Sequence, residues 1–201
     1  DKAPILSWWF QFMETVQDRL IEFSPWELSQ LIRSLMGQVD ASKEALLTTS
    51  FLTLALKCAE RQFFTTFTAR DLEGLATSLS KLPPHLYKPS PRFFRALVKA
   101  ADTHLSSGFR PPTLARLLHA LSRLEGCSPD PFFLQRAEQA CAASANKWDQ
   151  ASLALVSQAW SWMKYQPSEA TLSALLTQAK GMLLDGSLTP LNAGTLIQSL
   201  G

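Results

Sequence analysis

Residues 114–121, LARLLHAL, place leucine at positions i, i+3 and i+7, so the three side chains share one face of an α-helix. Similar apolar patterns begin at residues 28, 72, 153 and 193, and successive starts are 44, 42, 39 and 40 residues apart. We name these five stretches the A helices. They are predicted over residues 24–38, 68–82, 111–124, 149–163 and 190–201.

A second helical pattern, with apolar or small residues at i, i+4 and i+7, runs between the A helices. It begins at Trp9, Phe51, Phe93, Phe133 and Leu172. We name these stretches the B helices and predict them over residues 7–22, 43–64, 91–106, 131–145 and 168–184. Because each helix carries a single apolar stripe, it can bury that stripe only against neighbouring helices.

Capping residues and prolines mark the predicted helix starts. The segment Ser24-Pro25-Trp26-Glu27 has the form of a capping box, and Thr68 with Asp71 has a similar arrangement. Prolines open four further helices, at Pro91, Pro111, Pro131 and Pro190. Proline inside a helix costs about 3 kcal/mol, so these positions constrain the register of the repeat.

The sequence therefore predicts an all-α fold. We expect residues 1–201 to form a single right-handed α-solenoid of about five helix-pair repeats, with a period of about 39–44 residues. The alternative is an ordinary helical bundle whose helices are alike by chance, and the matched pairs with preserved caps favour the solenoid. The chain starts at Asp1 rather than Met and ends inside a helical pattern, so we expect a fragment of a longer protein.

Charge and hydropathy narrow the function only slightly. Nineteen Lys and Arg against seventeen Asp and Glu give a formal net charge of +2, well below the basic balance of a free nucleic-acid-binding domain. Polar residues interrupt every long apolar stretch, so we expect no membrane span.

Residues suited to metal binding or catalysis lack the necessary spacing. The three cysteines and three histidines have no partners at ligand spacing, so we expect no metal and no cofactor. No glycine-rich phosphate loop, nucleophile elbow or matched pair of carboxylates is present in the sequence. We therefore expect no catalytic residues and predict that the chain is not an enzyme.

Three segments share an apolar helix and a polar turn followed by proline: LATSLSKL (75–82), LLHALSRLEGCSPDP (117–131) and QAWSWMKYQPSE (158–169). Over residues 7–201 the chain resembles the octotricopeptide-repeat family and its relatives, including the heptatricopeptide repeats of proteins that also carry a RAP domain. The resemblance implies a fold similar to that of pentatricopeptide proteins. It also implies organellar RNA binding, transcript maturation, translation control or a place in an organellar ribosome.

In such stacks one helix of each pair lines the concave surface, so equivalent side chains of successive A helices form a column. The column five residues after each A-helix start is polar throughout, at Arg33, Thr77, His119, Gln158 and Gln198. Helical-repeat proteins read RNA with a few such side chains per repeat, so these are candidate RNA contacts. The alternative is that the column only faces solvent, where polar residues are expected.

Basic residues near the A helices are candidate phosphate contacts: Arg70, Lys81, Arg110, Arg116, Arg123 and Lys164. The alternative is that they serve solubility alone. On the B helices, Arg92 and Arg95 are predicted to face the convex side, where they suit a contact with RNA or protein. Aromatic residues at matching B-helix starts are predicted to lie in the core: Phe93, Phe94, Phe132 and Phe133.

We expect an organellar RNA-associated helical-repeat protein that binds RNA on its concave face. It would be a ribosome subunit or a factor for RNA maturation or translation, located in the mitochondrion or, alternatively, in a plastid. Its partners would be RNA and the neighbouring proteins of a ribonucleoprotein assembly, and near-neutral charge favours the ribosomal subunit. The alternative function is a protein-binding scaffold of the tetratricopeptide or HEAT kind.

Overall fold

The computed structural model describes residues 11–36, 51, 53–58, 66–82, 88–106 and 108–200. Every regular element in these ranges is a helix, which confirms the predicted all-α class. The B helices predicted over 7–22 and 43–64 lie partly outside the described residues, and their described parts are helical at 11–17 and 53–58. Within the described ranges, no helix has the length and apolar character needed to cross a bilayer.

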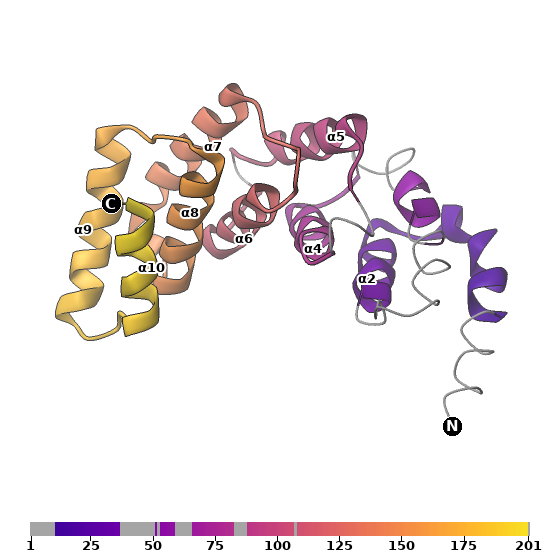
Figure 1. Ribbon diagram of the computed structural model, residues 1–201, viewed down its shortest axis with the longest axis horizontal. Helices are drawn as coiled ribbons and strands as arrows, with labels where there is room; N and C mark the ends of the chain where they lie inside the picture. Colours follow the sequence, from indigo (N-terminus) through magenta and orange to yellow (C-terminus); the bar gives the residue numbers. More distant parts are fainter. Residues whose placement is uncertain are drawn as a thin grey trace.

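The helices form two rows. The first row occupies the positions of the A helices and comprises α2 (Pro25–Met36), α4 (Ala69–Leu79), α6 (Pro111–Ser122), α8 (Gln150–Met163) and α10 (Pro190–Leu200). The second row comprises α5 (Pro91–Asp102), α7 (Pro131–Ala143) and α9 (Glu169–Leu184). Short 3₁₀ turns, Leu20–Glu22 and Ala145–Lys147, precede α2 and α8. The second row arches outside the first, so the first row lies on the inner side of the curve (Figure 1).

The most extensive contacts between helices are those within the first row. Each first-row helix packs against the next, in the order α2, α4, α6, α8 and α10. The leading residues of the apolar stripes, Leu28, Leu72, Leu114 and Leu153, are all buried. Because these stripes are buried, the opposite side of each first-row helix faces away from the core. We call the surface made by these opposite sides the inner face.

Helix starts follow the predicted caps. The backbone N–H of Ser24 donates to the Glu27 carboxylate at 2.8 Å, and the Glu27 N–H donates to Ser24 Oγ at 3.3 Å, which confirms the capping box. Thr68 and Asp71 form a second box at α4. By contrast, α5 ends at Asp102, before the predicted end at residue 106. The N–H groups of His104 and Leu105 bond to carbonyls three residues back, as in a 3₁₀ turn, so the α-helical pattern of hydrogen bonds ends there.

A buried carboxylate joins α7 to the start of α9. Glu138 accepts hydrogen bonds from the Tyr165 hydroxyl at 2.5 Å, the Ser168 N–H at 2.8 Å and the Thr171 hydroxyl at 2.8 Å. Ser168 is also the N-cap of α9. The position of α9 against α7 therefore depends on a single charged acceptor with several donors.

The Glu138 cluster predicts a specific dependence of stability on pH. Burial alone would raise the pKa of Glu138, but hydrogen bonds from Ser168, Tyr165 and Thr171 outweigh it and lower the pKa from 4.5 to about 2. A carboxyl whose pKa is lowered by folding stabilises the fold above its unfolded pKa and loses that contribution as the pH falls. We expect Glu138→Gln to lower stability at neutral pH and to reduce the loss of stability between about pH 4.5 and about pH 2.

The measurement is urea unfolding at a series of pH values, followed by circular dichroism. The control is Glu125→Gln, because Glu125 is exposed and lies outside the cluster. An unchanged pH dependence in Glu138→Gln would mean that the cluster does not stabilise the ionised carboxylate.

Candidate functional site

A groove of about 560 Å³ crosses α2, α4 and α6. Five of the sequence-predicted contact residues line it: Arg33, Arg70, Thr77, Lys81 and Arg116. These positions lie opposite the buried stripe of their helices, so the groove opens on the inner face. The structure thus brings together residues that are up to 83 positions apart in the chain, from Arg33 to Arg116.

One acidic residue in this groove is neutralised from the neighbouring helix. Glu73 on α4 is buried, and its carboxylate accepts a hydrogen bond from Arg116 Nε on α6 at 3.1 Å. The Thr77 hydroxyl donates to the same carboxylate oxygen at 3.1 Å. Arg116 therefore links α6 to α4, while Thr77 supports the same carboxylate from within α4, and both side chains are less available to a ligand.

Arg33 reaches across from α2 to α4. A Cβ atom on Gly74 would lie 3.1 Å from the Nη2 atom of Arg33, so only glycine leaves this space open without adjustment. Glycine inside a helix costs about 1 kcal/mol relative to alanine. The neighbour is the end of a long side chain rather than backbone, so a Cβ at this position would displace the Arg33 guanidinium by a few tenths of an ångström.

Three cations of the groove lack a counter-ion in the described part of the chain. No described carboxylate forms an ion pair with Arg33, Arg70 or Lys81, and all three side chains are exposed. The acidic residues nearby are already engaged, since Glu73 pairs with Arg116 and Asp71 completes the capping box of α4. The groove therefore presents a local excess of positive charge to solvent.

Further along the inner face, between α6 and α8, the side chains are polar and aromatic rather than cationic. His119 Nε2 lies 3.0 Å from Gln158 Oε1, so two neighbouring members of the predicted polar column bond to each other. The His119 ring also lies against the Trp162 ring, with centroids 5.2 Å apart. Burial lowers the pKa of His119 below 6.5, while the bond with Gln158 opposes this and Arg123 adds to it. The lowered pKa favours the neutral ring at physiological pH, and a hydrogen bond to Gln158 Oε1 requires the tautomer that carries its proton on Nε2.

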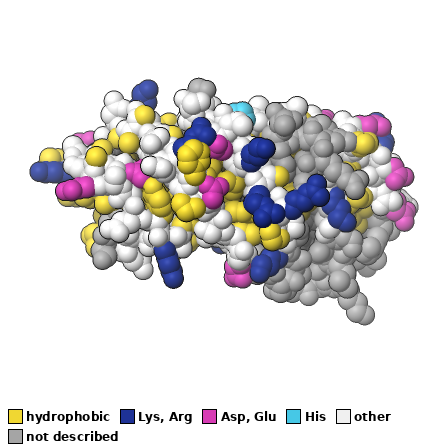
Figure 2. Space-filling model, turned by 90° about the horizontal axis from the view of Figure 1, so that it is seen from above, with side chains coloured by type: hydrophobic (Ala, Val, Ile, Leu, Met, Phe, Trp, Pro, Cys, Tyr) yellow, Lys and Arg dark blue, Asp and Glu magenta, His cyan; other side chains and the backbone are white. Residues whose placement is uncertain are grey.

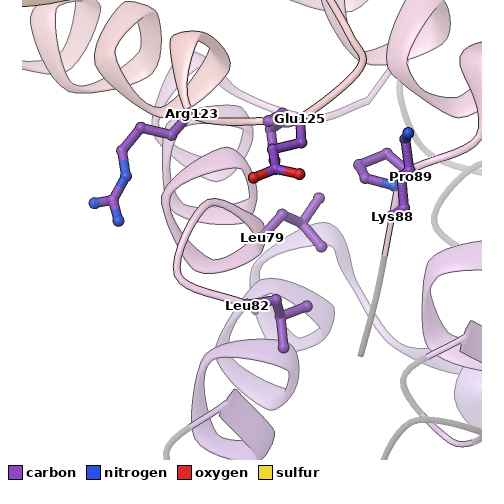
Figure 3. Close-up of a pocket in the computed structure, with 7 residues that line it drawn as sticks. Leu79, Leu82, Lys88, Pro89, Arg123 and Glu125 are labelled. Carbon is purple, nitrogen blue, oxygen red and sulfur yellow. The ribbon is translucent and has the colours of Figure 1, made fainter. Parts of the chain in front are cut away.

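The remaining predicted contacts do not line the groove. Arg110 and Lys164 are exposed next to the ends of α6 and α8, and Gln198 is exposed on α10. Arg123 lies at a second, much smaller pocket beside the ends of α4 and α6 (Figure 3). That pocket has a volume of about 10 Å³, room for about one water molecule, so it is not a ligand site.

Two exposed tryptophans on the inner face were overlooked in the sequence. Trp26 on α2 lines the groove and is 59% exposed, and Trp162 near the end of α8 is 48% exposed. Both lie outside the apolar stripes: Trp26 is two residues before the start of its A-helix pattern at residue 28, and Trp162 is nine residues after the start at residue 153. Their angular position on the helix was the signal that could have identified them. Both exposed rings are suited to stack on planar ligands, and Trp26 also lies beside the unpaired cations of the groove.

Two further kinds of site, metal centres and reactive thiols, can be assessed among the described residues. Among the described residues, no cluster of three or more His, Cys, Asp or Glu is arranged to hold a metal ion. Burial raises the pKa values of Cys127 and Cys141, so neither thiol ionises readily.

The pairing of Glu73 with Arg116 can be tested by a double-mutant cycle. Arg116→Ala leaves a buried carboxylate without its charged donor, and we expect a loss of about 1–2 kcal/mol in the free energy of unfolding. Glu73→Gln should cost less in the Arg116→Ala background than in the wild-type protein, because the charge no longer needs a partner. Urea unfolding of the four proteins measures this coupling, and strictly additive losses would contradict it.

Comparison with known proteins does not place this chain in a family. No protein-family model matches it. No curated protein is significantly similar to it in sequence.

Proposed function

We propose that this chain is an RNA-binding helical-repeat protein, a right-handed α-solenoid that holds single-stranded RNA along its inner face. The solenoid is supported by the strongest helix contacts, which join each first-row helix to the next. Bonds between equivalent helices, such as that from His119 to Gln158, also span about one repeat. In a solenoid each repeat contacts mainly its neighbours, and this is the expected packing.

The single observation that carries the proposal is the cationic groove with an exposed aromatic ring. Arg33, Arg70 and Lys81 line it without ion pairs to described carboxylates, and Trp26 stands beside them. Phosphates need cations that are not already neutralised, and unpaired bases need planar groups on which to stack. A duplex would not expose its base faces in this way, so a single strand fits better.

Helix electrostatics separate cations that stabilise the fold from those that do not. Lys81, Arg123 and Lys164 lie at the carboxyl ends of first-row helices, where positive charge is favourable. Arg70 lies in the first turn of α4, and Arg110 is the N-cap of α6 without a capping hydrogen bond. A cation at a helix N-terminus opposes the helix dipole, at a cost of about 0.3–1 kcal/mol. Arg70 and Arg110 therefore do not stabilise their helices through the dipole, and binding an anionic ligand would explain their presence at these positions.

The cellular setting in the proposal follows from the family resemblance. We place the protein in the mitochondrion, with a plastid as the alternative, as a ribosome subunit or as a factor for RNA maturation or translation. The modest formal net charge of +2 favours a subunit, because an assembled protein shares its contacts between RNA and neighbouring proteins.

RNA binding by the groove can be tested through its salt dependence. The probe is a fluorescein-labelled single-stranded RNA of about 20 nucleotides, measured by anisotropy over a range of KCl concentrations. Each of Arg33→Ala, Arg70→Ala and Lys81→Ala should weaken binding and reduce the slope of log K against log salt by about 0.7. Lys180→Ala, which removes an exposed lysine from α9, is the matched control.

The tryptophans should behave differently from the cations. Trp26→Ala and Trp162→Ala each remove a stacking surface and should cost about 1–3 kcal/mol of RNA affinity while leaving the salt slope unchanged. If the three single cation variants and both tryptophan variants bind RNA like the wild type, the inner face is not an RNA site. A protein-binding scaffold would then be the better function.

Association with an organellar ribosome has its own measurement. We expect the tagged protein in mitochondrial lysate to sediment with a ribosomal subunit and to move to slower fractions after ribonuclease treatment. Slow sedimentation that is unaffected by ribonuclease would contradict the assembly and favour the scaffold.

A further inference from the structure

One aromatic side chain that the sequence predicts in the core lies instead on the outside. Phe133 and its counterpart Phe93 are buried as predicted, but Phe132 is 66% exposed at the start of α7. Phe133 corresponds to Phe93 and the buried Leu134 to the buried Phe94, so Phe132 lies one residue before this buried pair, about 100° away from Phe133 around the helix. The counterpart of Phe132 on α5 is Arg92, which is also exposed.

The exposed ring is held in place by a bridge to the preceding second-row helix. The Arg136 guanidinium lies 5.9 Å from the centroid of the Phe132 ring. The same guanidinium donates to the carboxylate of Asp102, at the end of α5, at 2.5 Å. This bridge links α7 to α5 and places the Arg136 guanidinium over one face of the Phe132 ring, which favours the observed orientation of the ring.

A groove of about 400 Å³ lies between α5 and α7 beside this ring. Its floor is apolar and includes Phe94, Val98 and Phe133, while Arg95 and Lys99 stand on the α5 side. Exposed apolar surface beside fixed charge is typical of sites that receive a partner side chain. It lies on the second row and is separate from the inner face.

Basic and acidic side chains both line this groove, and they differ in how far they are engaged within the fold. Arg95 and Lys99 are exposed and form no ion pair with a described carboxylate. Both acidic residues of the groove are engaged, since Asp102 pairs with Arg136 and Asp130 caps α7 by accepting from the Phe133 N–H. Figure 2 views this face and shows Lys and Arg side chains gathered on it beside hydrophobic ones.

We infer that the groove between α5 and α7 binds an acidic segment of a partner protein, with an apolar anchor side chain against Phe132 and the floor and carboxylates against Arg95 and Lys99. Charge complementarity selects the acidic partner. RNA fits less well, because Arg136 already covers one face of the Phe132 ring and the floor beneath is apolar rather than suited to phosphate or sugar. This surface does not depend on RNA binding by the inner face.

The test uses the full chain and synthetic peptides. The probes are fluorescein-labelled helical peptides of about 15 residues, with leucines at i, i+3, i+4 and i+7 and glutamates elsewhere, in several registers. A matched set carries glutamine in place of glutamate. We expect the glutamate peptides to bind more tightly than the glutamine peptides, and Phe132→Ala and Lys99→Glu each to weaken binding about tenfold.

Two controls separate this site from the inner face and from loss of folding. Arg33→Ala should leave peptide binding unchanged, and thermal melting should show that Phe132→Ala, which alters an exposed ring, still folds cooperatively. The inference is overturned if no glutamate peptide binds in any register, or if bound peptides are insensitive to both substitutions. It is also overturned if Phe132→Ala and Lys99→Glu weaken binding of the single-stranded RNA probe, because the groove would then belong to an RNA site.

Discussion

Contact between consecutive first-row helices is the interaction on which the rest of the molecule depends. Leu72, Leu117 and Leu153, on three successive first-row helices, are completely buried. Burial of a leucine side chain contributes about 1.5–3 kcal/mol, and no helix of about 12 residues could gain this alone in water. Because the apolar stripes face the core, the opposite sides of these helices are turned to the same surface. The inner face is therefore a consequence of how the core packs.

Hydrophobic contact is not directional, so polar bonds between neighbouring pairs specify how the helices are offset. Gln150 at the start of α8 accepts from the Thr189 N–H at 2.7 Å and from Asn192 Nδ2 at 3.1 Å, at the start of α10. The bond between His119 and Gln158 plays the same role between α6 and α8. Apart from the exposed Thr189, these polar groups are half-buried and costly when unpaired. A shift of one helix along its neighbour would lose their bonds.

The sequence contained the helices and their starts but only part of the site. Capping residues such as Ser24 and prolines such as Pro111 act locally, so their effect can be predicted without knowing the fold. Pairing of Glu73 with Arg116 depends on the lateral offset between α4 and α6, which periodicity does not encode. The prediction that Phe132 lies in the core is wrong, because sharing a residue type with the buried Phe133 does not give it the same angle on the helix.

The formal net charge of +2 does not describe how charge is distributed over the surface. Acidic and basic side chains beside the two grooves differ in whether they bond within the fold. Four acidic residues beside the two grooves cap helices or form ion pairs within the fold: Asp71, Glu73, Asp102 and Asp130. Unpaired cations such as Arg33 therefore dominate the groove of the inner face, and Arg95 and Lys99 dominate the groove of the second row. A partner protein in the outer groove and RNA on the inner face would contact different rows of helices, so neither excludes the other. A protein that joins RNA to its neighbours in an assembly needs two such independent surfaces.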